Sequence, residues 1–269
     1  MKFFKNLTIG QYIHKDSIIH QLDPRIKILT TFLIIIVVFL IDKWIGFLII
    51  SAYLFIVIIL SKVNPKYVLM GIKPLLFIII FTLLIHFFTT QGEIIYTIWF
   101  FTVTKEGVYR GLFIATRLFL LIMSTSWLTL TTSPIALTDG IERLLSIFKI
   151  IRIPMPAHEI AMMMTIALRF IPTLMEETEK IMKAQMARGA DFESKNIVKR
   201  IKNMIPIIIP LFINAFHRAD ELAIAMEARC YRGGNGRTHY RELSIKTNDR
   251  IFFIITFMFI ITVFVLKFI

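Results

Sequence analysis

The sequence predicts an all-α membrane protein with about five transmembrane helices and three cytoplasmic or interfacial amphipathic helices. Of its 269 residues, 57% are hydrophobic and 25 are phenylalanine, and the mean hydropathy is +0.73. A soluble domain does not need so much apolar side chain. About 20 apolar residues cross a hydrocarbon core of roughly 30 Å as a helix, and five stretches have about this length. They are residues 26–41, 44–61, 68–88, 107–131 and 249–268.

The first two stretches predict a helical hairpin, because only Asp42 and Lys43 form a turn between them. The first stretch is short for a span. The third has Lys73 and Pro74 near its start, where a lysine can extend to the membrane surface and a proline kink is tolerated. The loop at residues 91–105 predicts a small β-hairpin at the membrane interface, since aromatic and β-branched residues lie between glycines.

The distribution of lysine and arginine predicts the orientation, because loops that carry these residues stay on the cytoplasmic side. The loops of one side hold most of them, which are Lys2, Lys5, Lys15, Arg25, Lys62 and Lys66. The loops of the other side hold Lys43 and Lys105. No apolar run precedes the fifth charged residue, so we expect no cleaved signal peptide. We therefore expect a multi-pass protein of the cell membrane, with the N-terminus and residues 132–248 in the cytoplasm and the C-terminus outside.

Three parts follow from this topology. Residues 1–131 form the N-terminal tail and the first four transmembrane helices, residues 132–248 form cytoplasmic helices, and residues 249–269 form the last transmembrane helix. The middle part holds 17 Lys and Arg residues and 12 Asp and Glu residues, which is most of the charge in less than half of the chain. Function is expected to reside there.

The middle part predicts three helices. The first begins at Ser133 and Pro134, as an N-cap followed by proline, and ends near Pro154. The second covers residues 156–187, and we expect Pro172 to bend it. The third begins near Ser194. The second and third are apolar in their first halves and charged toward their ends, so each is expected to run along or through the bilayer and then leave it.

Both long helices end on an Ala-Arg pair followed by a turn. The first tip is Ala187-Arg188-Gly189, and the second is Ala228-Arg229-Cys230, with a glycine pair at 233–234. An arginine in the last turn interacts favourably with the helix dipole by about 0.3–1 kcal/mol, and a glycine can end the helix. Alternatively, the small alanine leaves a tip from which a guanidinium can bind a partner's carboxylate or carbonyls as a planar fork. The spacing alone leaves both interpretations open.

The sequence predicts no catalytic residue, no metal site and no nucleic-acid partner. Cys230 is the single cysteine, so no thiolate cluster can form, and no histidine lies near it in the sequence to activate it. The phosphate-loop pattern GxxxxGK[ST] does not occur, which excludes ATP hydrolysis through that motif. Acidic and basic residues alternate in the middle part, whereas a nucleic-acid site would show an unmixed basic cluster.

Two polar residues inside predicted spans are candidates for structural roles. Arg117 lies about ten residues into the fourth stretch, roughly 15 Å deep. An intramembrane arginine is a functional candidate, but pairing with the carbonyls of a neighbouring helix or with a carboxylate is favoured here. His86, near the end of the third stretch, is expected to form hydrogen bonds at the interface. The turn Asp23-Pro24-Arg25 either holds the first span at the membrane surface or contacts the cytoplasmic helices.

Three segments resemble the EcfT family, the transmembrane subunits of energy-coupling factor transporters, which are a branch of ATP-driven importers. They are GQYIHKDSIIHQLDPRIK at 10–27, ALRFIPTLMEETEKIMKAQMARGADFE at 167–193 and PLFINAFHRADELAIAMEARCYRGGNGRTHYREL at 210–243. The last two are long and specific, and the resemblance covers nearly the whole chain. It implies a coupling subunit that transmits the motion of two ABC ATPase subunits to a small membrane substrate-binding subunit, the S component, for uptake of a vitamin or another micronutrient.

The resemblance also implies roles for individual residues. The ATPases would bind the two tips through six residues, which are Ala187, Arg188, Gly189, Ala228, Arg229 and Cys230. Because Cys230 stands where the family usually has glycine, the second tip either turns without glycine's freedom or turns later, at Gly233. The ATPases would use ATP and Mg²⁺, and no cofactor would bind to this chain directly.

We further expect an apolar surface for the substrate-binding subunit. Methionine adapts to partners of different shape, which suits a sliding contact. The candidates are Met162, Met163, Met164, Ile205, Ile208 and Phe212, and plain internal packing is the alternative for them. The alternative for the whole chain is a membrane scaffold or channel-like protein that binds cytoplasmic partners without coupling to ATP.

Overall fold

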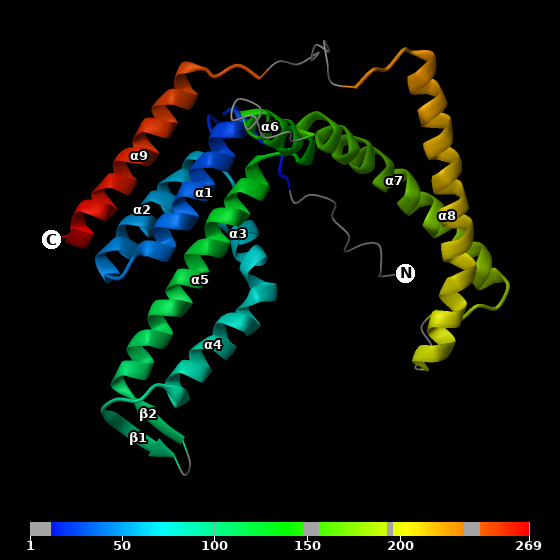
Figure 1. Ribbon diagram of the computed structural model, residues 1–269. Helices are drawn as coiled ribbons and strands as arrows, with labels where there is room; N and C mark the ends of the chain where they lie inside the picture. Colours follow the sequence, from blue (N-terminus) through cyan, green and yellow to red (C-terminus); the bar gives the residue numbers. More distant parts are fainter. Residues whose placement is uncertain (1–11, 99–100, 148–155, 193–195, 234–242, 269) are drawn as a thin grey trace. The chain divides into compact units, whose positions relative to one another are not determined.

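The computed structural model describes residues 12–98, 101–147, 156–192, 196–233 and 243–268. It is almost entirely helical (Figure 1). The elements are α1 (Pro24–Leu40), α2 (Trp44–Leu60), α3 (Pro65–Ile72), the 3-10 helix η1 (Lys73–Leu75), α4 (Leu76–Thr89), β1 (Ile94–Ile98), β2 (Phe101–Thr104), α5 (Lys105–Thr131), α6 (Pro134–Ser146), α7 (Ala157–Ala187), α8 (Ile197–Ala228) and α9 (Thr247–Phe268). The chain divides into two compact units, Met1–Ile141 with Arg241–Ile269 (unit 1) and Glu142–Tyr240 (unit 2).

Unit 1 is built around a bundle of α1, α2, α5 and α9. Helices α1 and α2 each pack against both α5 and α9. The centre of the bundle is apolar, and its most deeply buried side chains include Val38, Leu54, Leu120 and Trp127. A hydrogen bond of 2.6 Å between the Tyr53 and Thr256 hydroxyls links α2 to α9 inside this core. Most of the remaining apolar side chains face outward, as expected for helices surrounded by lipid.

Helices lie at all five stretches predicted to span the membrane, so the prediction of an all-α membrane protein is confirmed. In the part of the chain that the structure describes, three helical segments are long and apolar enough to cross a bilayer, namely Pro65–Thr89, Lys105–Thr131 and Thr247–Lys267. Helices α1 and α2 have 17 residues each, about 25 Å at 1.5 Å per residue. These two are shorter than the roughly 30 Å core, as the length of the first stretch indicated.

The third predicted span is broken where the sequence indicated. Helix α3 passes through the 3-10 turn η1 into α4, and η1 contains Lys73 and Pro74. Proline lacks the N–H that would continue the α-helical ladder, and its ring crowds the preceding turn. A single 3-10 turn accommodates both effects without separating the two helices.

Helix α4 packs closely on α5 because two glycines remove side chains from the contact. Gly107 and Gly111 are four residues apart and face α4. A Cβ on Gly107 would lie 2.7 Å from the carbonyl oxygen of His86, and one on Gly111 would lie 3.1 Å from the ring of Phe87. This is the small-xxx-small packing by which membrane helices approach closely. The GxxxG spacing of Gly107 and Gly111 is visible in the sequence, although it does not show which helix packs there.

We expect Gly107→Ala to lower the unfolding temperature of the detergent-solubilised protein, with a cost of about 1–3 kcal/mol. The added methyl group would meet a backbone carbonyl, which cannot rotate away. Gly71→Ala is the matched control, since its Cβ would meet mainly the hydroxyl of Ser126 at 2.8 Å, and that side chain can turn. Equal unfolding temperatures for the two variants would contradict this account of the α4–α5 contact.

The predicted β-hairpin is present between α4 and α5. Strands β1 and β2 pair in antiparallel fashion, with Ile98 opposite Phe101. Thr104 then begins α5, because its hydroxyl accepts a hydrogen bond from the Gly107 N–H and donates one of 2.7 Å to the Thr90 carbonyl. The hairpin therefore joins the ends of two packed helices.

Unit 2 contains α7 and α8, and the boundary between the units lies within α6. Within the described residues α6 ends at Ser146, whose hydroxyl donates to the Arg143 carbonyl. The predicted stop at Pro154 lies outside the described residues. Helix α7 continues without interruption through Pro172. The predicted start of α8 at Ser194 also lies outside the described residues, and the helix begins at Ile197.

Candidate functional site

The first arginine tip is a complete helix cap. Arg188 is the C-cap of α7, directly after Ala187, and Gly189 follows in the left-handed region with φ +88°. The Gly189 N–H donates to the Met186 carbonyl at 2.9 Å, and the Ala190 N–H donates to the Gln185 carbonyl at 3.0 Å. These two bonds define a Schellman motif, which satisfies carbonyls that the helix end would leave open.

The second tip has the same hydrogen bonds around a different residue. Arg229 ends α8, and Cys230 follows with φ +54°. The Cys230 N–H donates to the Glu227 carbonyl at 2.8 Å, and the Tyr231 N–H donates to the Met226 carbonyl at 3.0 Å. The backbone therefore presents Arg188 and Arg229 in equivalent positions at the ends of two helices.

The second helix ends three residues before Gly233, at the turn formed by Cys230. Gly233 does have φ +79°, but the chain has already left the helix at Cys230, and Gly234 lies outside the described residues. Of the two alternatives raised by the sequence, the turn without glycine holds. A non-glycine residue in this region costs roughly 1–2 kcal/mol, because its Cβ approaches a carbonyl oxygen.

The two caps turn at different residue types, glycine at 189 and cysteine at 230, and we expect substitutions at these positions to change amide hydrogen exchange in opposite directions. Cys230→Gly should slow the amide hydrogen exchange of Tyr231 by about 5-fold, since about 1 kcal/mol of strain is removed. Gly189→Ala should accelerate exchange at Ala190 by a similar factor. Hydrogen exchange with mass spectrometry resolves both peptides. The same direction of change in both variants would contradict the equivalence of the caps.

Both tips are open to solvent. Every member of the two predicted docking sets is exposed. The residues are Ala187, Arg188, Gly189, Ala228, Arg229 and Cys230. An added Cβ on Gly189 would meet no atom within 4 Å. The tips are therefore accessible to a partner, as a docking role requires.

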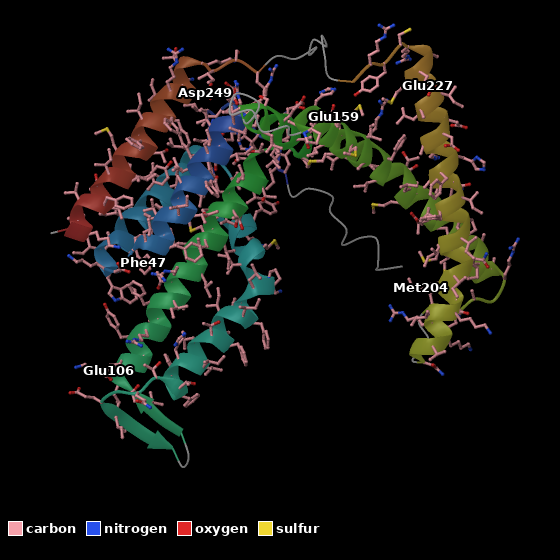
Figure 2. The ribbon with its side chains drawn as sticks, viewed as in Figure 1. Phe47, Glu106, Glu159, Met204, Glu227 and Asp249 are labelled. Carbon is pink, nitrogen blue, oxygen red and sulfur yellow. The ribbon has the colours of Figure 1, made fainter. Side chains whose placement is uncertain are left out.

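The two helices that carry the tips are antiparallel neighbours. An ion pair joins Arg218 on α8 to Glu177 on α7. Nearer the end of α7, the Asn203 side chain donates a hydrogen bond of 2.7 Å to the carbonyl of Asp191, which lies just after that helix. As residue numbers rise along α7 they fall along α8, so the tips point in opposite directions. In Figure 2, Glu227 marks the end of α8 near its tip and Met204 lies toward the other end.

An apolar surface covers the first half of α8. The predicted partner-contact residues Ile205, Ile208 and Phe212 are all exposed, and Phe212 is 62% exposed. On α7, Met163 is 58% exposed. Its neighbours Met162 and Met164 are half-buried. Because the helices are antiparallel, the methionines and the α8 residues lie on opposite sides of the Glu177–Arg218 pair, and they form two patches instead of one.

Comparison with known proteins assigns the family. The family model CbiQ, described as Cobalt transport protein, matches residues 15–240. The energy-coupling factor transporter transmembrane protein EcfT of Thermosediminibacter oceani is 54% identical over 252 residues, which are 94% of each chain. This chain belongs to the EcfT family. The EcfT of Ruminiclostridium cellulolyticum is 50% identical over 265 residues, 98% of each chain, and that of Bacillus subtilis is 48% identical over 239 residues, 88% and 89% of the two chains.

Membership confirms the resemblance found in the sequence. The chain is a transmembrane component of an energy-coupling factor transporter, and it resides in a membrane. Its relatives are named as transmembrane proteins of energy-coupling factor transporters. Family membership does not test the roles assigned to single residues, which stay predictions.

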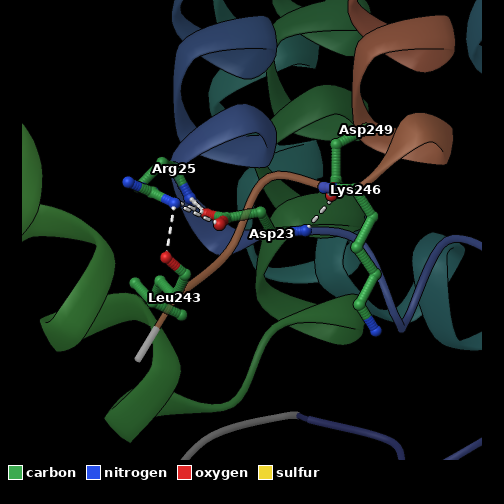
Figure 3. A network of polar contacts seen from close by, with 5 residues as sticks. All are labelled: Asp23, Arg25, Leu243, Lys246 and Asp249. Carbon is green, nitrogen blue, oxygen red and sulfur yellow. Dashed lines mark hydrogen bonds and ion pairs between the residues drawn. The ribbon is translucent and has the colours of Figure 1, made fainter. Parts of the chain in front are cut away.

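A buried polar network at one face of unit 1 was not predicted (Figure 3). Asp249, in the first turn of α9, accepts hydrogen bonds from the Asp23 N–H and the Lys246 N–H, each at 2.7 Å. The Asp23 carboxylate in turn accepts two hydrogen bonds from the Arg25 guanidinium, at 3.0 and 2.7 Å. Arg25 also donates to the Leu243 carbonyl at 3.1 Å. The Asp23-Pro24-Arg25 turn thus holds the start of α1 to the start of α9.

Lys27 extends this network to α5. Its side chain is 1% exposed, and its ammonium donates to the carbonyls of Thr131 at 2.9 Å and His20 at 3.2 Å. We call this side of unit 1 the anchored face, defined by Asp23, Lys27, Thr131 and Asp249. Thr131 and Asp249, which flank residues 132–248 in the sequence, therefore lie at the same face of unit 1, whereas the sequence showed Lys27 and Asp249 only as charges near span ends.

Electrostatics at the anchored face keeps Asp23 ionised. Burial by itself would raise the pKa of the Asp23 carboxyl, but the hydrogen bonds and charge of Arg25, with the charge of Lys27, hold the pKa below its ordinary value. At the opposite face, Lys267 pairs with Asp42 at 2.7 Å, and this hydrogen bond lowers the pKa of Asp42. The two faces together fix α1 and α9 side by side in the same direction.

The structure places Arg117 in the position favoured by the sequence analysis. Its guanidinium donates to the carbonyl of Ile41 at 2.7 Å, at the end of α1, and lies 5.2 Å from the ring centre of Phe113. This contact satisfies a terminal carbonyl of a helix and adds a cation–π interaction. His86 is half-buried in α4, where its backbone carbonyl faces Gly107. The predicted hydrogen bond of its ring stays a prediction.

Proposed function

We propose that this chain is the coupling subunit of an energy-coupling factor importer. Arg188 and Arg229 bind two ABC ATPase subunits, which use ATP and Mg²⁺. Helices α7 and α8 then transmit the motion of the ATPase pair to a small membrane substrate-binding subunit. The imported substrate is a vitamin or another micronutrient, and the substrate-binding subunit selects it. The N-terminus and the tips lie in the cytoplasm, and the C-terminus lies outside.

The equivalence of the two tips is the observation that carries this proposal. Two exposed arginines follow alanines at the ends of two long helices, and both caps have the same hydrogen bonds. A favourable helix dipole explains an arginine in a last turn, but it does not require the same small-residue cap twice. Two equivalent helix tips suit a pair of related ATPase subunits, because each tip can bind in the same kind of groove on one subunit.

The exposed apolar side chains of α8 support the role of the substrate-binding subunit. Ile205, Ile208 and Phe212 lie on the part of α8 that precedes the charged half carrying Arg229. A partner that binds there would contact the same rigid helix that an ATPase moves. Motion at the tip would then reach the partner without passing through a flexible loop.

Reconstitution tests the proposal. The chain is co-expressed with the two ATPases and the substrate-binding subunit, purified, and placed in vesicles loaded with ATP and Mg²⁺. We expect the four proteins to purify together and labelled substrate to accumulate only when ATP is hydrolysed. Labelled vitamins and Co²⁺ are both tested, because the family model is described as a cobalt transport protein. Binding of cytoplasmic partners without ATP-dependent uptake would instead support a scaffold.

A further inference from the structure

We propose that the Glu177–Arg218 ion pair sets the spacing and relative direction of the two arginine tips. These two residues are positioning residues, since they act through α7 and α8 and not by touching a partner. The inference rests on the proposed function for its consequence in transport. Its structural part, the spacing of the tips, stands apart from that function.

The position of the pair is the first reason. Arg188 follows Glu177 by 11 residues, and Arg229 follows Arg218 by 11 residues. Each tip therefore lies about 16 Å from the pair along its own helix, at 1.5 Å per residue. Because the helices are antiparallel, the tips lie on opposite sides of the pair. A slip or rotation at the pair would change the separation of the tips directly.

The surroundings of the pair are the second reason. Nearly all residues of α8 between Arg218 and the tip are exposed, so little packing within the described residues holds this arm. Helices α7 and α8 also contact each other, but burial of apolar surface is not directional and by itself permits sliding. A charged pair has one preferred geometry, and specifying register is the best-attested use of such pairs.

The burial of Glu177 is the third reason. The side chains of Glu177 and Arg218 are 19% and 33% exposed. Among the described residues, the second carboxylate oxygen of Glu177 is buried and has no hydrogen-bond partner. Arg218 is thus the group that compensates this charge in the described part of unit 2.

The test measures the distance between two spin labels in the full-length chain in lipid nanodiscs. The labels are attached to cysteines at the exposed positions Ala184 and Ala225, each seven residues beyond the pair, with Cys230→Ser removing the native thiol. Arg218→Glu should shift the mean distance by about one helical turn, roughly 5 Å, or double the width of the distribution. The exchanged pair, Glu177→Arg with Arg218→Glu, should restore the original distribution. Glu221→Lys, an exposed charge change on the same helix, should leave it unchanged.

The second measurement uses the reconstituted transporter. Arg218→Glu should lower the amount of substrate taken up per ATP hydrolysed by at least about 10-fold while the ATPases still bind, because mispositioned tips can bind without transmitting motion. The exchanged pair should recover this ratio. Glu177→Gln and Arg218→Gln, which remove charge without repulsion, serve if the reversed variant does not fold.

The outcomes separate the two proposals. An unchanged distance distribution in Arg218→Glu and in both glutamine variants would overturn the inference. A changed distance with an unchanged ratio of uptake to hydrolysis would overturn its consequence for transport. If the ATPases do not bind this chain at all, the proposed function fails, and the distance measurement on the free chain still decides whether the pair sets the spacing.

Discussion

Reversal of both tip arginines should abolish the association of this chain with its ATPases. Truncating one side of a buried charged contact costs about 2–5 kcal/mol, largely because the other charge is left without a partner. Each of Arg188→Glu and Arg229→Glu should therefore weaken binding by at least about 30-fold, since 1.4 kcal/mol corresponds to a factor of ten. The double variant should retain neither ATPase during purification in detergent.

The control for this prediction is Lys66→Glu with Lys105→Glu. It makes the same change in net charge at two exposed positions of unit 1, outside the two helices that carry the tips. We expect this variant to retain both ATPases. Unfolding temperatures of all variants are measured without ATPases, so that loss of binding is separated from loss of folding. Full retention of the ATPases by the double arginine variant would remove both residues from the interface.

The second large effect is expected at Asp249, which is 1% exposed. Asp249→Ala would leave the buried N–H of Asp23 and the N–H of Lys246 without their acceptor, and it would remove a negative charge from the first turn of α9. Removing one member of a buried charged network costs about 3–5 kcal/mol. We expect the unfolding temperature of the full-length protein to fall on the order of 10 °C.

Asp249→Asn should have an intermediate effect, because the amide oxygen can still accept one of the two hydrogen bonds. Asp16→Ala is the matched control, since Asp16 is an exposed aspartate in the segment before α1. If Asp249→Ala unfolds at the temperature of the Asp16→Ala control, then the anchored face does not depend on this carboxylate.

Local patterns in the sequence were sufficient for the helices and for one of the caps. Apolar stretches placed all five membrane helices within a few residues, and Gly189 correctly marked the end of α7. The second cap was uncertain because the sequence shows glycine at 233 and 234, whereas the chain turns at Cys230.

Contacts between distant segments were beyond the sequence. Asp23 and Asp249 are 226 residues apart, and Glu177 and Arg218 are 41 residues apart. Each of these residues is one charge among many in the sequence, and nothing local distinguishes it from a solvated charge. Their partners depend on which faces of which helices meet.

By itself, the sequence determined a helical membrane protein with two arginine-ended helices and a resemblance to EcfT, because hydropathy, caps and motifs act over a few residues. Only the tertiary structure decided that the two caps are equivalent, that α7 and α8 are antiparallel and joined by Glu177 and Arg218, and that α1, α5 and α9 meet at one charged face. These features arise from the packing of whole helices, in which the free energy depends on shape and charge brought together from distant parts of the chain.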